Sequence, residues 1–152
     1  MPIRSMLSCL TVPLLLVAAC GDGDESDTEN PNTTTPTTFA EQVSLGQSVY
    51  AANCAKCHGD SGQGSDEAPR LVGLDQGALP LDPPASRKVR KDKFETVADV
   101  ANFVVANMPP GAAGSLSTEK YLAVLAFDLK ANGITLQQKL DLELAETLTI
   151  PR

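Results

Sequence analysis

Metal-binding and aromatic side chains are scarce in this chain of 152 residues. It has no Trp, two Tyr and four Phe, and His58 is its single His. After residue 20, the remaining sulfur side chains are Cys54, Cys57 and Met108. A structural zinc site usually pairs one Cys-x-x-Cys motif with a second Cys or His pair, and no second pair exists here. With one His and no Ser-His-Asp arrangement, nothing in the sequence points to a hydrolase.

Positive charge is also in short supply. The chain has 12 Lys and Arg against 19 Asp and Glu, which gives a net charge of −7. Because proteins that bind nucleic acid present a basic face, nucleic acid is not an expected partner. Basic residues gather only between Arg87 and Lys93, where Asp92 interrupts them.

Long hydrophobic runs are missing as well. The longest apolar stretch extends from Met6 to Ala19 behind Arg4. It is too short to span a bilayer comfortably, and it has the layout of a secretory signal. Its end, Val17-Ala18-Ala19-Cys20, resembles the lipobox of bacterial lipoproteins.

The lipobox resemblance implies a signal peptide over residues 1–19, cleavage before Cys20 and lipidation of Cys20. The protein would then be a membrane-anchored lipoprotein of a bacterial cell envelope, facing the periplasm. An uncleaved anchor and an ordinary secretory signal are the alternatives.

The segment that follows Cys20 has almost no apolar residues. Residues 21–38 contain five acids and no base. Such a segment cannot bury enough surface to offset the entropy lost on ordering. We therefore predict a flexible tether over residues 20–37, spanning about 25 Å as a coil, ahead of a folded domain that begins at residue 38.

Cys54 and Cys57 belong to the sequence Cys-Ala-Lys-Cys-His, which ends at His58. A thioredoxin-like dithiol would need a βαβ context with β-branched strand runs, which the chain lacks. Cys-x-x-Cys-His is also the attachment signature of c-type haem. In that chemistry each thiol adds to one vinyl group of the porphyrin, and the His binds the iron. An export signal favours this interpretation, since c-type haem is attached outside the cytoplasm.

At this point the chain resembles the class I c-type cytochromes, over roughly residues 38–133. The positions that carry the resemblance lie in the family's order along the chain. They are Gly46 and Tyr50, eight and four residues before Cys54; Pro69 after the His; Met108, followed by Pro109; and Val124 with Phe127 near the end.

The resemblance implies an all-α fold, a cytochrome c-like orthogonal helix bundle around one covalently bound haem c. Cys54 and Cys57 would hold the haem, and His58 and Met108 would be the axial iron ligands. The carbonyl of Pro69 would accept the Nδ1 proton of His58. Arg70 is a further candidate, as a partner of a haem propionate.

Local patterns predict where the helices lie. Thr38 and Thr96 are each followed three residues later by a carboxylate, which is the capping-box spacing at a helix start. Ser117 begins a third helix, which ends before Gly133. Pro109 forces Met108 out of the helical region, so Met108 sits just past the end of the second helix.

The C-terminal extension, residues 134–152, lies beyond the range of the resemblance. Leu136, Leu140, Leu144 and Leu148 recur every four residues. This spacing predicts a short helix that packs back on the domain.

An iron held by His and Met has no free position for a substrate, which implies a one-electron carrier rather than an enzyme. Its partners would be respiratory or periplasmic redox proteins. They would dock at the haem edge or, if acidic, on the Arg87–Lys93 segment, which is otherwise a solvated loop. A haem c subunit of a larger oxidoreductase, and a gas-binding or peroxidatic haem protein, are the alternatives.

Overall fold

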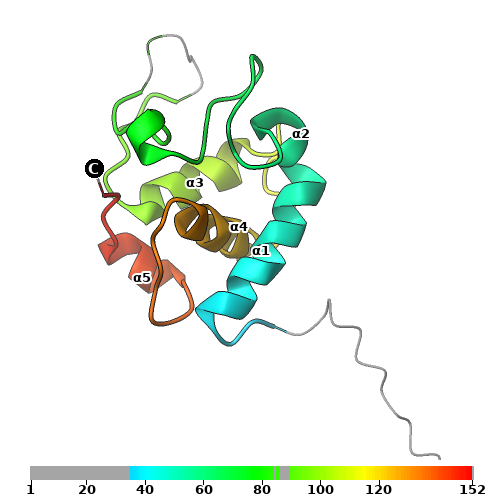
Figure 1. The fold of residues 1–152 in the computed structure, drawn as a ribbon, viewed down its shortest axis with the longest axis vertical. Coiled ribbons are helices and arrows are strands. Elements are labelled where there is room, and N and C mark those ends of the chain that lie inside the picture. Colours follow the sequence, from blue (N-terminus) through cyan, green and yellow to red (C-terminus); the bar gives the residue numbers. More distant parts are fainter. Residues whose placement is uncertain (1–34, 84, 86–89, 152) are drawn as a thin grey trace, which may run out of the picture.

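The computed structural model describes residues 35–83, 85 and 90–151, and the remaining residues are drawn in grey in Figure 1. The expected signal peptide, Cys20 and most of the expected tether lie outside these ranges, as do Arg87 and Lys88. The described residues form helices and no strand, with one isolated β-bridge between Thr96 and Thr149. The all-α class is therefore confirmed.

The first helix, α1, spans Phe39–Asn53 and begins at the expected capping box. The hydroxyl of Thr38 accepts a hydrogen bond from the Glu41 N–H at 3.2 Å, and the Glu41 carboxylate accepts one from the Thr38 N–H at 3.1 Å. Hydrogen bonds from Thr37 and Thr38 lower the pKa of Glu41 below its usual value. The helix ends at Cys54, and a single further turn, α2, spans Ala55–His58.

Helix α3 spans Val97–Asn107 and has the second expected capping box, between Thr96 and Asp99. Met108 caps its C-terminus with extended backbone angles, φ −122° and ψ 145°. This is the geometry that Pro109 imposes on the residue before it. A 3-10 turn, η1, spans Leu74–Gln76 in the long connection between α2 and α3.

Helix α4 spans Thr118–Ala131 and crosses α1 closely (Figure 1). A Cβ atom built on Gly46 of α1 would lie 1.9 Å from the carbonyl oxygen of Ala123 in α4. Only glycine allows this approach, because real Cβ contacts under 3.0 Å are essentially absent. The ring of Tyr50 packs against that of Phe127 beside the crossing, with the ring centres 5.1 Å apart.

The C-terminal extension contains a shorter helix than the leucine spacing predicted. Helix α5 spans only Leu142–Thr147, so Leu136 and Leu140 precede it and Leu148 caps its end. The backbone of Leu140 is instead held by the side chain of Gln42, through two hydrogen bonds of 2.8 Å. Leu140 and Gln42 are both fully buried.

The rest of the extension pairs with the start of α3. The N–H of Val97 donates to the carbonyl of Leu148 at 2.9 Å, and the N–H of Ile150 donates to the carbonyl of Glu95 at 3.1 Å. Residues of the extension, among them Leu140, Ala145 and Ile150, join residues of α3 and α4 in the larger of two buried clusters. The extension thus forms part of the core of this domain.

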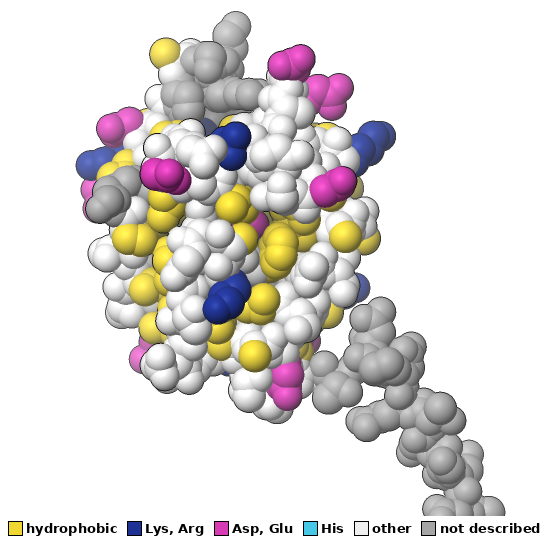
Figure 2. Space-filling model, in the orientation of Figure 1, with side chains coloured by type: hydrophobic (Ala, Val, Ile, Leu, Met, Phe, Trp, Pro, Cys, Tyr) yellow, Lys and Arg dark blue, Asp and Glu magenta, His cyan; other side chains and the backbone are white. Residues whose placement is uncertain are grey.

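One face of the molecule shows hydrophobic side chains through its middle, while Asp and Glu side chains lie mainly toward its edge (Figure 2). None of the helices within residues 35–83, 85 and 90–151 is long and apolar enough to cross a bilayer.

Candidate functional site

The Cys-Ala-Lys-Cys-His sequence lies where α1 gives way to α2. The N–H groups of Cys57 and His58 both donate to the carbonyl of Cys54, at 3.1 and 3.0 Å, so the motif forms one compact turn. Both thiols are free and half-buried. Burial, with smaller contributions from Asp128 and Cys57, raises the pKa of the Cys54 thiol to about 11. A redox-active dithiol relies on a lowered thiol pKa, so this environment argues against that interpretation.

The imidazole of His58 is buried and held in one orientation. Its Nδ1 lies 2.8 Å from the carbonyl oxygen of Pro69, the contact that the family resemblance implies. A carbonyl can only accept a hydrogen bond, so Nδ1 carries the proton and Nε2 keeps the lone pair that can bind a metal. A partner of this kind also fixes the ring orientation of metal-binding histidines.

The loop after the motif is folded tightly enough to bring Pro69 back to His58. The N–H of Gly64 donates to the carbonyl of His58 at 2.7 Å, and the hydroxyl of Ser65 donates to the carbonyl of Cys57 at 2.6 Å. Gly64 has a φ of +81°, and a Cβ atom there would lie 2.7 Å from the Arg70 backbone nitrogen. The phenol of Tyr50 donates to the carbonyl of Gly59 at 2.7 Å, which ties the loop to α1.

Met108, the expected second ligand, is half-buried at the end of α3. Its N–H closes the helix on the carbonyl of Val104 at 2.8 Å. Its carbonyl accepts a 2.8 Å hydrogen bond from the phenol of Tyr121 on α4. The residue is therefore anchored through its backbone on both sides, while the side chain takes no part in these bonds.

Arg70 and Arg90 both donate hydrogen bonds to backbone carbonyls nearby in the chain. The guanidinium of Arg70 donates to the carbonyl of Val72 at 3.2 Å, and its expected role toward a propionate stays a prediction. Arg90 is buried, donates to the carbonyl of Asp82 and lies 3.9 Å from the ring centre of Phe94. Arg90 thus belongs to the interior rather than to a docking surface, because its charge is covered.

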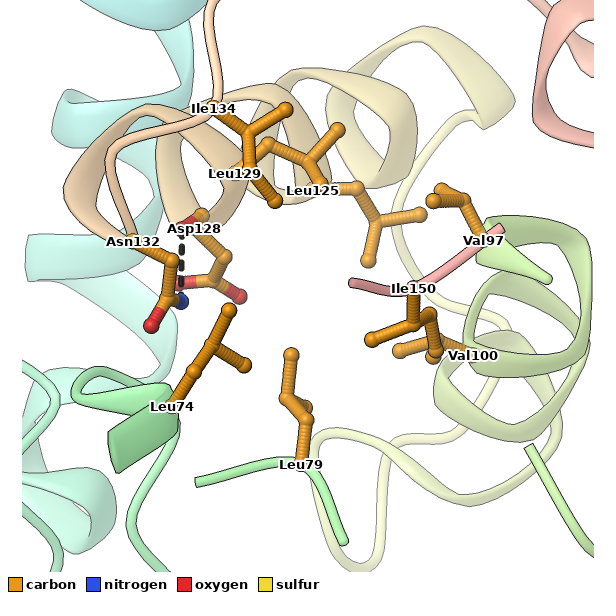
Figure 3. A pocket seen from close by; sticks show the side chains of 10 residues that line it. All are labelled: Leu74, Leu79, Val97, Val100, Leu125, Asp128, Leu129, Asn132, Ile134 and Ile150. Carbon is orange, nitrogen blue, oxygen red and sulfur yellow. Dashed lines mark hydrogen bonds between the residues drawn. The ribbon is translucent and has the colours of Figure 1, made fainter. Parts of the chain in front are cut away.

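Asp128 lies among the buried apolar residues of α4 and is not among the site residues that the sequence predicts. The carboxyl of Asp128 is buried, and its Oδ1 atom has no hydrogen-bond partner. It lies at a small cavity lined by the loop around η1, by α3 and by the C-terminal extension (Figure 3). The signal available in the sequence was one acid between Tyr121 and Leu129, where every other residue is apolar.

The residues present fit a haem. An imidazole with a free Nε2 and a thioether are the donor set of electron-transfer haems, and the half-buried thiols lie within one turn of the imidazole. Apolar side chains surround the motif: Val49, Tyr50 and Val124 form the smaller buried cluster, against which Leu71, Leu116, Phe127 and Cys54 pack. Among residues 35–83, 85 and 90–151, no three His, Cys, Asp or Glu side chains gather as a metal site of another kind.

Comparisons with known proteins agree with this chemistry. A family model described as cytochrome C oxidase, cbb3-type, subunit III, matches residues 41–127, more than half of the chain. The chain also resembles a chain in the crystal structure of the sulfane dehydrogenase SoxCD from Paracoccus pantotrophus, with 27% identity and a TM-score of 0.53. That match covers 88% of this chain and 69% of the other. No curated protein sequence matches. The chain therefore belongs to the family of cytochrome c oxidase, cbb3-type, subunit III, and is a class I c-type cytochrome.

Proposed function

We propose that the protein is a one-electron carrier with a single covalently bound haem c. The observation that carries the proposal is the hydrogen bond between Nδ1 of His58 and the carbonyl of Pro69. His58 is the last residue of the Cys-x-x-Cys-His motif. That bond leaves Nε2 as the donor for the iron. Cys54 and Cys57 would bind the haem through thioether bonds, and Met108 would supply the second axial ligand.

A bound haem supplies an iron that cycles between the ferric and ferrous states. The chain's own residues limit how far the two proposed ligands move when the oxidation state changes. Pro69 keeps the imidazole of His58 in one orientation, and Tyr121 keeps the backbone of Met108 in place. Thioether ligation raises the potential because a soft sulfur favours the ferrous state. If His58 and Met108 both held the iron, no position would remain open on it for a substrate or oxygen.

The proposed location is the bacterial cell envelope. A signal over residues 1–19 and a lipid on Cys20 would anchor the domain to a membrane on its periplasmic side. The tether over 20–37 would let it reach respiratory or periplasmic redox proteins. The lipobox-like sequence supports this part of the proposal.

A subunit role in a larger oxidoreductase is the second candidate. The similarity to a chain of SoxCD, a sulfane dehydrogenase, favours it. A carrier and a subunit would use the same haem chemistry and would differ in whether a partner stays bound. Purification of the membrane-extracted protein in a mild detergent, followed by sizing, separates the two: a stable assembly with a second protein favours the subunit role.

The experiment that tests the electron-carrier proposal is a potentiometric titration of the matured holoprotein at one fixed pH. We expect a reversible curve for one electron, and a protein mass increased by one haem that survives denaturation. The Cys54→Ala, Cys57→Ala double variant should lose the covalent haem. The Cys9→Ala variant should keep it, because Cys9 lies in the expected signal peptide. Absence of haem in the mature wild type, or a haem that cannot be titrated reversibly, would overturn the proposal.

The membrane anchor is tested separately. Labelled fatty acid should be incorporated into the wild type and the Cys9→Ala variant but not into Cys20→Ala, which should also move from the membrane to the soluble fraction. Labelling of the Cys20→Ala variant would contradict the assignment of Cys20.

A further inference from the structure

Asp128 is a buried acid that none of the roles proposed above uses. Its side chain is 8% exposed, and Oδ1 has no hydrogen-bond partner. A buried polar atom without a partner costs about 1–3 kcal/mol. Such an atom in a native core therefore calls for a physical reason.

The side-chain amide of Asn132, which lines the same cavity, is already engaged in other hydrogen bonds. The side chain of Asn132 donates from Nδ2 to the carbonyls of Leu71 at 3.0 Å and Asp128 at 2.8 Å, and its Oδ1 accepts from the N–H of Gly73 at 2.9 Å. These bonds clamp the loop before η1 to the end of α4. They leave no donor for the Asp128 carboxyl, although Asn132 lies one turn away (Figure 3).

The carboxyl faces a small cavity whose other walls are almost all apolar. The cavity has a volume of about 20 Å³, enough for one water molecule. Apart from Asp128 and Asn132, aliphatic side chains line it: Leu74, Leu79, Val97, Val100, Leu125, Leu129, Ile134 and Ile150 (Figure 3). Ile134 and Ile150 come from the C-terminal extension, so the extension helps to keep bulk water away from this carboxyl.

The same carboxyl lies close to the proposed haem attachment. Asp128 interacts electrostatically with Cys54, the first thiol of the motif, and with Tyr50 on the same helix. Tyr50 stays neutral because burial, with Asp128 adding to it, raises the pKa of its phenol to about 12. Cys54 would no longer titrate once bonded to the porphyrin. The residues that line the cavity from η1, α3 and the extension carry no charge.

We propose that Asp128 is a redox-linked proton-binding site: its carboxylate takes up a proton from solvent as one electron enters the protein, and releases it as the electron leaves. The inference rests on the proposed electron-carrier function. A one-electron protein donor supplies the electron, and a hydronium ion of the solvent supplies the proton. One O–H bond of that ion breaks and leaves water, as one O–H bond forms on Asp128.

The physical reason is charge balance in a region of low dielectric. In the oxidised protein Asp128 lies near one more positive charge than in the reduced protein, and this favours the carboxylate. In the reduced protein that charge is absent and the buried neutral acid is favoured. Burial already raises the pKa of Asp128 to about 8 in this structure. The two protonation states therefore exchange near neutral pH.

The test is the midpoint potential of the holoprotein, measured from acidic to alkaline pH. In the pH range in which Asp128 binds a proton only in the reduced state, the midpoint potential should fall as the pH rises. The limiting slope is about 59 mV per pH unit, the value of a tenfold change for one electron. The Asp128→Asn variant should lose this slope. Asp66→Asn, which removes an exposed carboxylate, should keep it.

A second readout does not depend on a variant. Reduction of the wild type should produce an infrared band of a protonated carboxyl group that shifts when the protein carries carbon-13-labelled aspartate. A haem propionate would give no such shift, so the label separates the two sources. If the Asp128→Asn variant does not fold, this readout still shows whether an aspartate takes up the proton, and Asp128 is the buried aspartate among the described residues.

The proposal is overturned by a potential independent of pH, by an unchanged slope in Asp128→Asn, or by the absence of a label-sensitive band. Any of these results, together with a reversible one-electron titration at fixed pH, would leave the electron-carrier function intact. Loss of that titration would overturn the function, and this proposal with it.

Discussion

The phenol of Tyr121 donates a 2.8 Å hydrogen bond to the backbone carbonyl of Met108, the residue that we propose as the second iron ligand. Tyr50 makes the corresponding 2.7 Å bond to the carbonyl of Gly59, directly after His58. The backbone at or next to each proposed ligand thus accepts a hydrogen bond from a buried phenol, Tyr121 of α4 at Met108 and Tyr50 of α1 beside His58. The crossing of these two helices positions both sides of the site.

Replacing Tyr121 by Phe should loosen the Met108 side of the site. The change removes one hydrogen bond and leaves a carbonyl without its partner, which costs on the order of 1 kcal/mol. We expect the weak red absorption band of sulfur-to-ferric ligation to disappear at a lower temperature than in the wild type. Tyr50→Phe is the matched control, and it should disturb the His58 side. Equal loss of the band in both variants would contradict the separate roles of the two phenols.

The Gly46→Ala variant should be strongly destabilised. A Cβ atom at this position would lie 1.9 Å from the Ala123 carbonyl, so α1 and α4 must move apart. Overpacking of this kind costs about 1–3 kcal/mol, and sometimes more. The free energy of unfolding in urea measures the cost. Gln47→Ala, at the next and exposed position of α1, should be neutral or slightly stabilising. Equal stability of the two variants would mean that the crossing is looser than described.

Gln42 should contribute more to stability than its polar character suggests. Gln42→Leu keeps the volume but leaves the buried N–H and carbonyl of Leu140 without partners, at about 1–3 kcal/mol for each group. We expect a lower free energy of unfolding, together with faster proteolysis of the C-terminal extension. Gln138→Leu changes an exposed position in the extension and should cost little. Unchanged proteolysis of the Gln42→Leu variant would show that the extension is held without this contact.

Asp128 should make stability fall as the pH rises. Burial raises its pKa from the ordinary value of 3.8 to about 8, so the folded protein keeps a proton that the unfolded chain releases. The free energy of unfolding therefore falls as the pH rises from about 4 to about 8. Asp128→Asn should therefore gain stability over the wild type across this window, on the order of a few kcal/mol by its upper end.

Urea unfolding of the reduced holoprotein at both ends of the window measures this gain. Asp66→Asn is the control, since its exposed carboxyl should give a difference that is small at both pH values. A constant difference between Asp128→Asn and the wild type would show that Asp128 keeps an ordinary pKa in the fold.

The elements predicted well from the sequence are those set by neighbours along the chain. Thr38 and Thr96 begin helices because a hydroxyl and a carboxylate three residues apart satisfy the first free N–H groups. Met108 leaves α3 because Pro109 follows it. Such rules need no knowledge of the rest of the fold.

The features that were missed depend on contacts between distant segments. Leu140 was expected in a helix because leucines recur every four residues, but its backbone is held by Gln42, 98 positions earlier. Arg90 was expected in a solvated loop or on a docking surface and is instead buried against Phe94. Asp128 was not among the expected site residues. A local sequence pattern does not show which distant residue a side chain will contact in the core, or that it will contact none.

The most direct test of the account is a visible spectrum of the purified, membrane-extracted protein, recorded oxidised, then reduced, then reduced with carbon monoxide. We predict a low-spin c-type haem spectrum with the weak red band of sulfur ligation when oxidised, and no response to carbon monoxide when reduced. Met108→Ala should lose the band and bind carbon monoxide. A wild-type protein that is high-spin or binds carbon monoxide would contradict ligation by both His58 and Met108, and would move the function toward gas binding or peroxide chemistry.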